Sequence, residues 1–267
     1  MPFTLAHAAA AIPFRRLHLV TSALLIGTFA PDFEYFLRLA PDRRFAHTIL
    51  GTFVFTVPTA LLVLWIFHGF VKRPAITLLP SALRARLSSY LGEFRFGGPA
   101  RFALIVASVL LGIATHLFWD SFTHPNTWAY WRWEWLRQAM HLPALGMAPH
   151  YKVLQHLSTL VGTAIVAIWL IYWYRASKPS CEPLVESPTR PQRGRIIATV
   201  TAIALAGAII RALIGTQFLT TRLAYSKFGG EAVTAFIALV WWQLVIYGLV
   251  VSRPAATARG GEPPDPI

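Results

Sequence analysis

Five stretches of this 267-residue sequence are long, apolar and almost free of charge, and they limit the possible folds more than any other feature. A helix needs about 20 apolar residues to cross roughly 30 Å of hydrocarbon. We predict a membrane-spanning helix in each stretch, with a kink at Pro58, because proline leaves one carbonyl without its helical partner. The predicted spans are Ile49–Val71, Phe102–Trp119, Val153–Tyr174, Ile196–Thr221 and Ala232–Ser252.

The N-terminal segment contains two shorter apolar stretches, Phe3–Phe14 and Leu17–Pro31. As α-helices they would reach only roughly 18 and 22 Å, so neither crosses the bilayer comfortably. Pro13, Arg15 and Arg16 lie between them and favour a turn. The sequence therefore predicts an all-α, polytopic membrane helix bundle with about five long spans and a short N-terminal helical hairpin.

Charge composition fits the same fold class. Only 13% of the residues are charged, whereas soluble domains average about 25%. The formal net charge is +13, which in a soluble protein would indicate nucleic-acid binding. Here the basic residues flank the apolar spans, so we expect membrane lipid as the partner and no nucleic acid.

Lys and Arg are more frequent in the 72–101 loop, the 175–195 loop and the C-terminal tail than in the loops on the opposite side. The positive-inside rule then predicts a cytoplasmic C-terminus. We expect four regions in the chain. They are a membrane core (1–175), a flexible polar linker (176–195), a two-helix membrane hairpin (196–252) and a disordered tail (253–267).

The tryptophan-rich segment 127–143 separates two of the predicted spans. Amphipathic rings of this kind prefer the membrane interface, so we expect an interfacial helix or loop there.

Ionisable side chains beside apolar spans are costly and usually mark functional sites. His116 and Asp120 are four residues apart, so on a helix they share one face; His124 follows at the same spacing, but Pro125 should end the helix near it. Under the predicted topology, six such residues lie at the extracytoplasmic ends of their helices. They are His7, Asp32, Glu34, His47, His116 and Asp120.

Nitrogen and oxygen ligands in this combination suit zinc or another divalent first-row metal. Carboxylates from several helices can hold one ion or two. A buried polar network without metal would also tie the helices together, and the sequence leaves both alternatives open. Transport is disfavoured because there is no inverted repeat and the cluster lies at one face of the membrane.

Several motifs together resemble a bacterial multi-pass membrane family, the domain of unknown function 4184. They are FTLAHAAAAIPFRR, SALLIGTFAPDFEYFLRL, RRFAHTILG, LLGIATHLFWDSFTHP and YKVLQHLST, and the resemblance covers about residues 1–250. It implies a location in the bacterial inner membrane and no established activity.

The same motifs are more distantly similar to inner-membrane metal-dependent hydrolase-like proteins and to zinc-dependent phospholipase C. His7, Pro31 and Asp32 match that pattern, and Glu34 stands for its second Asp. Two histidines of the pattern are missing here: Tyr35 and Phe36 follow Glu34 in place of the first, and Asp42 replaces the second. Further matches are Arg43, His47, His116, Asp120 and Thr123.

This resemblance implies a metal-dependent hydrolase acting on a lipid or another membrane-associated phosphoester. A carboxylate not used as a metal ligand, Glu34 or Asp120, would accept the proton of the attacking water, and Arg43 would steady the phosphate charge. The alternative is a non-catalytic membrane scaffold or regulator with a structural metal or polar cluster.

Overall fold

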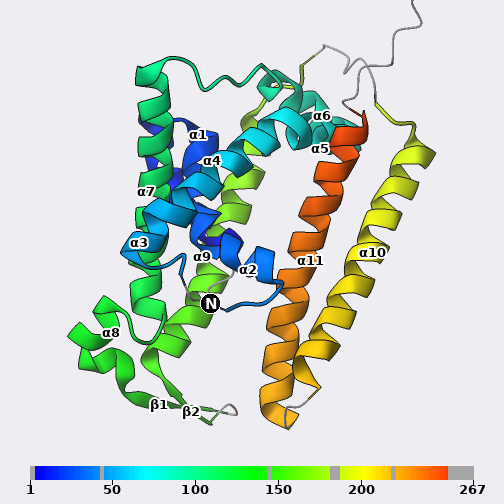
Figure 1. The fold of residues 1–267 in the computed structure, drawn as a ribbon. Coiled ribbons are helices and arrows are strands. Elements are labelled where there is room, and N and C mark those ends of the chain that lie inside the picture. The colour runs from blue at the N-terminus through cyan, green and yellow to red at the C-terminus, as the bar shows by residue number, and fades with distance from the viewer. Residues whose placement is uncertain (1–3, 43–44, 144–145, 181–186, 218–220, 252–267) are drawn as a thin grey trace, which may run out of the picture.

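The computed structural model describes residues 4–42, 45–143, 146–180, 187–217 and 221–251 (Figure 1). It confirms an all-α bundle with five helical stretches long and apolar enough to cross a membrane. Each predicted span overlaps one of them. They are Ile49–Leu78, Pro99–Arg132, His150–Ala176, Arg190–Thr216 and Lys227–Val251.

The first span is a helix interrupted by two π-helical segments. A π-helical turn precedes the segment that carries Pro58, and a second follows it. Such π turns accommodate the carbonyl that proline leaves without a partner. The successive segments are α3 (Ile49–Gly51), η3 (Thr52–Thr56), α4 (Val57–Ile66), η4 (Phe67–Val71) and α5 (Lys72–Leu78), and two short helices follow, α6 (Ser81–Leu87) and η5 (Ser88–Tyr90).

The N-terminal segment contains two helical arms that contact each other, but the turn predicted at Pro13, Arg15 and Arg16 is wrong, because all three lie inside the first arm and residues 17–20 join the two. Its first arm, η1 (Thr4–Arg16), is a 3-10 helix, whose rise of about 2.0 Å per residue makes it longer than the α-helix expected from sequence. The second arm consists of α1 (Thr21–Phe29), η2 (Ala30–Asp32) and α2 (Phe33–Arg38).

Two glycines let α1 lie against α7 (Pro99–Thr123) with their backbones in contact. A Cβ at Gly27 would meet the Val109 carbonyl, and one at Gly112 would meet the Leu24 carbonyl. Small residues allow this close approach between membrane helices, where apolar area alone gives little drive to associate. This backbone contact sets the position of the C-terminal end of α1 along α7.

The tryptophan-rich segment links α7 to α9 (His150–Ala176) at one end of the bundle. It folds as α8 (Trp128–Arg132), η6 (Glu134–Arg137) and an antiparallel pair of strands, β1 (Ala139–Leu142) and β2 (Gly146–Pro149). The prediction of an interfacial helix or loop did not include this small hairpin. Trp128 and Trp131 are both 63% exposed.

The last two helices, α10 (Arg190–Thr216) and α11 (Thr221–Val251), run antiparallel, and α11 packs against η4, α5 and α2 (Figure 1). Helix α10 begins inside the predicted 176–195 linker because Thr189 forms a capping box with Gln192. The predicted tail, 253–267, lies outside the described residues.

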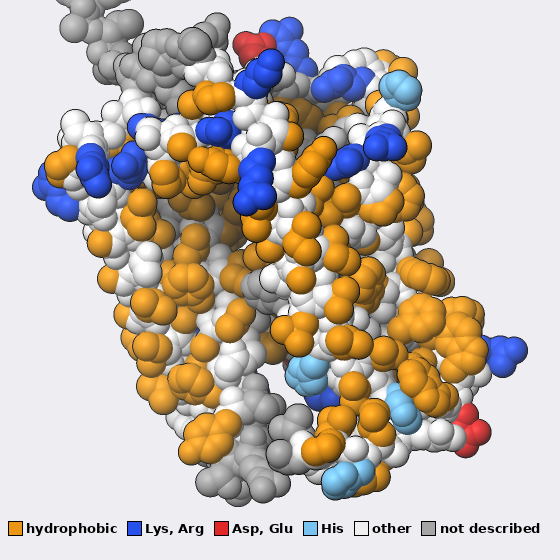
Figure 2. Space-filling model, turned by 180° about the vertical axis from the view of Figure 1, so that it is seen from behind, with side chains coloured by type: hydrophobic (Ala, Val, Ile, Leu, Met, Phe, Trp, Pro, Cys, Tyr) orange, Lys and Arg blue, Asp and Glu red, His pale blue; other side chains and the backbone are white. Residues whose placement is uncertain are grey.

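Figure 2 shows Lys and Arg side chains gathered at the end of the bundle where α5 and α6 lie, with apolar side chains over the flanks of the helices. The tryptophan-rich segment lies at the opposite end. Lys and Arg thus concentrate at one end of the bundle, as expected of a membrane protein whose two ends lie on opposite sides of the bilayer.

Candidate metal centre

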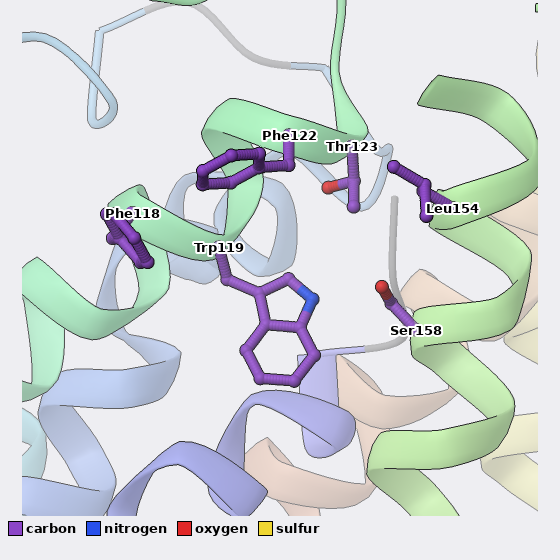
Figure 3. A pocket seen from close by; sticks show the side chains of 6 residues that line it. All are labelled: Phe118, Trp119, Phe122, Thr123, Leu154 and Ser158. Carbon is purple, nitrogen blue, oxygen red and sulfur yellow. The ribbon is translucent and has the colours of Figure 1, made fainter. Parts of the chain in front are cut away.

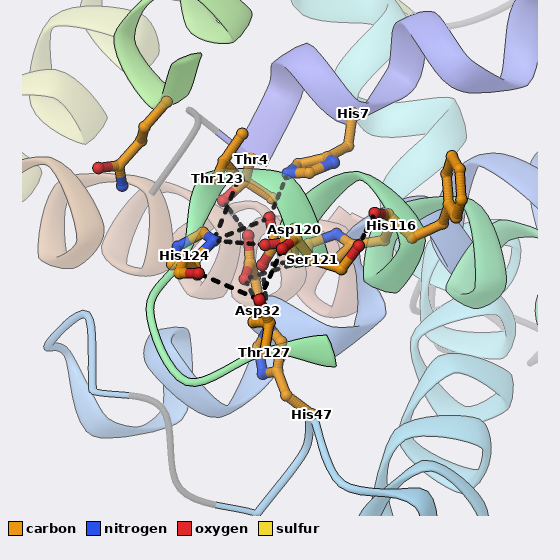
Figure 4. A network of polar contacts seen from close by, with 12 residues as sticks. Thr4, His7, Asp32, His47, His116, Asp120, Ser121, Thr123, His124 and Thr127 are labelled. Atoms are coloured by element: carbon orange, nitrogen blue, oxygen red, sulfur yellow. Dashed lines mark hydrogen bonds and ion pairs between the residues drawn. The ribbon is translucent and has the colours of Figure 1, made fainter. Parts of the chain in front are cut away.

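Five of the six predicted ligands come together in one buried cluster, which we call the His/Asp cluster (Figure 4). They arrive from four separate parts of the chain: η1, the end of η2, the loop before α3, and α7. The five residues are His7, Asp32, His47, His116 and Asp120. Asp32 and His116 are 0% exposed, so their charges and lone pairs have no contact with bulk water.

Within the cluster, each of two imidazole nitrogens faces both aspartates. His116 Nε2 lies 3.6 Å from Asp32 Oδ1 and 3.4 Å from Asp120 Oδ2. His47 Nε2 lies 3.7 Å from Asp32 Oδ1 and 3.6 Å from Asp120 Oδ2. These separations are longer than the 2.7–3.2 Å of ordinary N–H···O hydrogen bonds.

The same separations fit ligands around a shared ion. Metal–ligand distances of about 2.0–2.2 Å at a tetrahedral zinc place neighbouring ligand atoms about 3.4 Å apart. Neither His116 Nε2 nor Asp32 Oδ1 has a hydrogen-bond partner among the described residues. Asp32, His47 and His116 offer ligand atoms within 4.8 Å of one another, and Asp120 Oδ2 faces the same two imidazole nitrogens, so this group could hold a divalent cation.

Hydrogen bonds around the cluster orient two of these ligands. His116 Nδ1 lies 2.8 Å from the Thr28 carbonyl, which can only accept, so Nδ1 carries a proton and Nε2 is free to bind a metal. The Thr4 hydroxyl donates to Asp32 Oδ2 at 2.6 Å, which leaves Oδ1 facing the cluster. Histidine and carboxylate ligands of metal sites commonly have such outer partners.

The loop that carries His47 is held by polar contacts on both sides. Glu34 Oε2 accepts from the backbone N–H groups of Phe45 and Ala46, each at 3.0 Å. The Thr56 hydroxyl donates to the Ala46 carbonyl at 3.0 Å. The His47 side chain is 5% exposed, and its ring stacks on that of Tyr35.

Glu34 is therefore placed differently from the other predicted ligands. Its second oxygen, Oε1, pairs with Arg38 at 3.0 Å, so both oxygens have partners outside the His/Asp cluster. In the structure Glu34 positions the His47 loop. Arg43, predicted to steady a phosphate, lies outside the described residues.

His124 joins the cluster although the sequence analysis left it out of the ligand set. Helix α7 ends at Thr123, and His124 has an extended backbone. Its Nδ1 nevertheless lies 3.4 Å from Asp120 Oδ1. The four-residue spacing from Asp120 was the available signal, and the expected loss of helix at Pro125 argued against using it.

Burial sets the charge state of the two ligands that precede the first span. It lowers the pKa of His7 to about 3 and raises the pKa of Asp32. The imidazoles of His116 and His47 oppose the second effect. A neutral His7 keeps a lone pair for a metal, and an ionised Asp32 needs positive charge close by, which a bound cation would supply.

A cavity of about 300 Å³ adjoins the cluster between the end of α7 and the start of α9 (Figure 3). Thr123 lines it, and the Thr123 hydroxyl lies 3.2 Å from His124 Nδ1. The wall is mostly apolar. The lining residues are Phe118, Trp119, Phe122, Thr123, Leu154 and Ser158.

The fold and this cluster together define a polytopic helical membrane protein with groups that could hold a metal ion. The chain matches the family described as domain of unknown function DUF4184 over residues 1–252, and it belongs to that family. No curated protein and no solved structure matches the chain. The more distant resemblances to membrane hydrolase-like proteins and to phospholipase C are unsupported.

Proposed function

We propose that this protein is a metal-dependent hydrolase that acts on a membrane-associated phosphoester, such as a phospholipid. The observation that carries the proposal is the spacing of His47, His116, Asp32 and Asp120, whose facing atoms lie 3.4–3.7 Å apart in a buried site. These four residues would hold a zinc ion or a similar divalent cation. When bound, such an ion polarises a phosphoryl oxygen and lowers the pKa of a coordinated water.

The residues around the site have separate tasks in this proposal. Thr4 and the Thr28 carbonyl hold Asp32 and His116 in orientation, and Glu34 holds the loop of His47. Asp120 faces imidazoles through both oxygens and serves as a ligand in this proposal, so the predicted role of Asp120 as proton acceptor is not part of it. Arg43 stays a predicted phosphate contact.

The apolar cavity supports a lipid-like substrate. It is close to the minimum of about 300 Å³ for ligand pockets, and it adjoins the cluster through Thr123. A substrate entering between α7 and α9 would keep its apolar part in the cavity. We place the protein in the bacterial inner membrane with the α5–α6 end in the cytoplasm and the cluster toward the outer face, as the Lys and Arg distribution favours.

A second candidate is a non-catalytic scaffold in which the metal is structural. Four of the five cluster residues are buried and the His47 side chain is 5% exposed. This favours the scaffold, because structural metal sites are closed whereas catalytic sites keep one open position.

The test is metal content, measured by mass spectrometry on protein purified in detergent without chelator and then supplied with zinc or manganese. We expect wild type to retain metal after desalting, and His116→Ala and Asp120→Ala to lose it. His156→Ala, at an exposed position on α9, is the matched control. Hydrolysis of phospholipid vesicles by metal-loaded protein would favour the enzyme over the scaffold; folded wild type that takes up no metal would contradict both.

A further inference from the structure

The two oxygens of Asp120 face different sets of imidazoles. Oδ2 faces His47 and His116, at 3.6 and 3.4 Å. Oδ1 faces His7 Nε2 at 3.5 Å and His124 Nδ1 at 3.4 Å. One carboxylate thus lies between two groups of nitrogen ligands (Figure 4).

We infer that Asp120 bridges two divalent metal ions, the second held by His7, His124 and Asp120 Oδ1. This inference rests on the proposed function, which places the first ion at Asp32, His47, His116 and Asp120 Oδ2. Carboxylates bridge ions in this way in hydrolytic sites whose metals lie about 3.5–4 Å apart. His7 and Asp120 also belong to a group with His116 whose ligand atoms lie within 4.8 Å of one another, and this group shares His116 with the Asp32, His47 and His116 group.

The local structure holds both histidines of the second position in place. The His7 ring stacks on that of His116, with centroids 3.9 Å apart, and meets Trp119 edge-on. His124 follows the last residue of α7, and its extended backbone lets the ring turn back toward Asp120. Its Nδ1 also lies 3.3 Å from the Asp120 carbonyl, so binding of an ion there requires the ring to carry its proton on Nε2. Both distances to Oδ1 exceed those of ordinary hydrogen bonds and equal the spacing expected around an ion.

The two positions differ in the number of protein ligands. The first has four, which completes a tetrahedral shell. The second has three, which leaves one place for water or a substrate oxygen, as in catalytic zinc sites. The second position is also nearer the cavity, because Thr123 lines that cavity and contacts His124. A substrate oxygen could thus bind the second ion without displacing a protein ligand, whereas the first ion would have to expand to five ligands to bind one.

The chemical class of the second ion follows from its ligands. Two imidazoles and one carboxylate suit zinc, manganese or cobalt more than calcium or magnesium, which prefer oxygen alone. Manganese is a useful probe because two bridged Mn²⁺ ions give an exchange-coupled electron paramagnetic resonance spectrum.

The test combines metal stoichiometry with this spectrum, on the full chain in detergent saturated with Mn²⁺ and desalted. We expect two equivalents of bound Mn²⁺ per chain and an exchange-coupled spectrum in wild type and in His156→Ala. We expect His124→Ala to keep one equivalent and lose the coupling. The retained equivalent would itself show that the variant is folded and that its first position is intact.

Two other results would overturn the inference. One equivalent with an uncoupled spectrum in wild type would contradict the second ion and leave the proposed function standing. Two coupled equivalents in His124→Ala would contradict the assigned ligands. Absence of any bound metal in folded wild type would instead contradict the proposed function together with this inference.

Discussion

Charged groups are buried in both halves of this membrane bundle, but they are satisfied in different ways. In the α10–α11 pair, Arg211 donates to Glu231 at 2.8 Å, and Lys227 adds a second basic group 3.7 Å from that carboxylate. In the His/Asp cluster the facing atoms lie 3.4–3.7 Å apart. In the first arrangement the carboxylate is neutralised by direct contact with a guanidinium, whereas the second leaves the space of a cation between its ligands.

Burial of a charged group alone does not identify a functional site. Glu231 and Asp120 are equally buried, at 2% exposure each. The two carboxylates differ in their partners, because a guanidinium contacts Glu231 whereas imidazoles face Asp120. A carboxylate paired with a guanidinium is already balanced, whereas a carboxylate surrounded by imidazoles must share protons or bind a metal.

The largest effect should come from removing a ligand of the cluster. We expect His116→Ala to weaken metal binding by more than the roughly 10–100-fold that loss of an outer partner costs. Glu231→Gln should leave metal binding unchanged, because its charge pair lies in the other half of the bundle. Titration with a competing chelator would measure both affinities, and equal losses in the two variants would remove the distinction between the regions.

The next effect concerns stability of the α10–α11 pair. Glu231→Ala should lower the free energy of unfolding by about 3 kcal/mol, because Arg211 would be left without its partner in an apolar setting. The double variant Arg211→Leu, Glu231→Leu should recover most of the loss. Denaturant titration in detergent would measure both, and a double variant no more stable than the single one would speak against the ion pair as the cause.

A smaller change should follow from loss of an outer hydrogen bond. Thr4→Val removes the hydroxyl that donates to Asp32 Oδ2, so metal affinity should fall by roughly 10–100-fold. Thr199→Val, at an exposed position on α10, is the matched control and should have no effect. If the two variants bind metal equally well, Thr4 does not orient a ligand.

The smallest effect is expected from the cavity. Leu154→Trp should fill part of it and slow hydrolysis of a phospholipid several-fold while the metal content stays the same. Leu160→Trp adds the same ring on the 70%-exposed part of α9 and should leave the rate unchanged. Vesicle hydrolysis assays on metal-loaded protein would compare them, and equal rates would exclude the cavity as the route of the lipid.

The amino-acid sequence by itself determined the membrane fold and most of the cluster. Charge-free runs of sufficient length specify spanning helices because no other open structure satisfies its backbone in lipid. The costly ionisable residues at the ends of those runs were identified by the same argument, and His7, Asp32, His47, His116 and Asp120 indeed meet.

Only the tertiary structure decided which atoms face one another. It placed Glu34 on the backbone of the His47 loop and brought His124 to Asp120 after the helix had ended. Ligand geometry depends on differences of a few tenths of an ångström. In this protein the ligand positions depend on contacts between residues far apart in the sequence. Examples are Gly112 against the Leu24 carbonyl and His116 Nδ1 against the Thr28 carbonyl. Spacing along one helix carries no information about such contacts, because they depend on how separate helices pack.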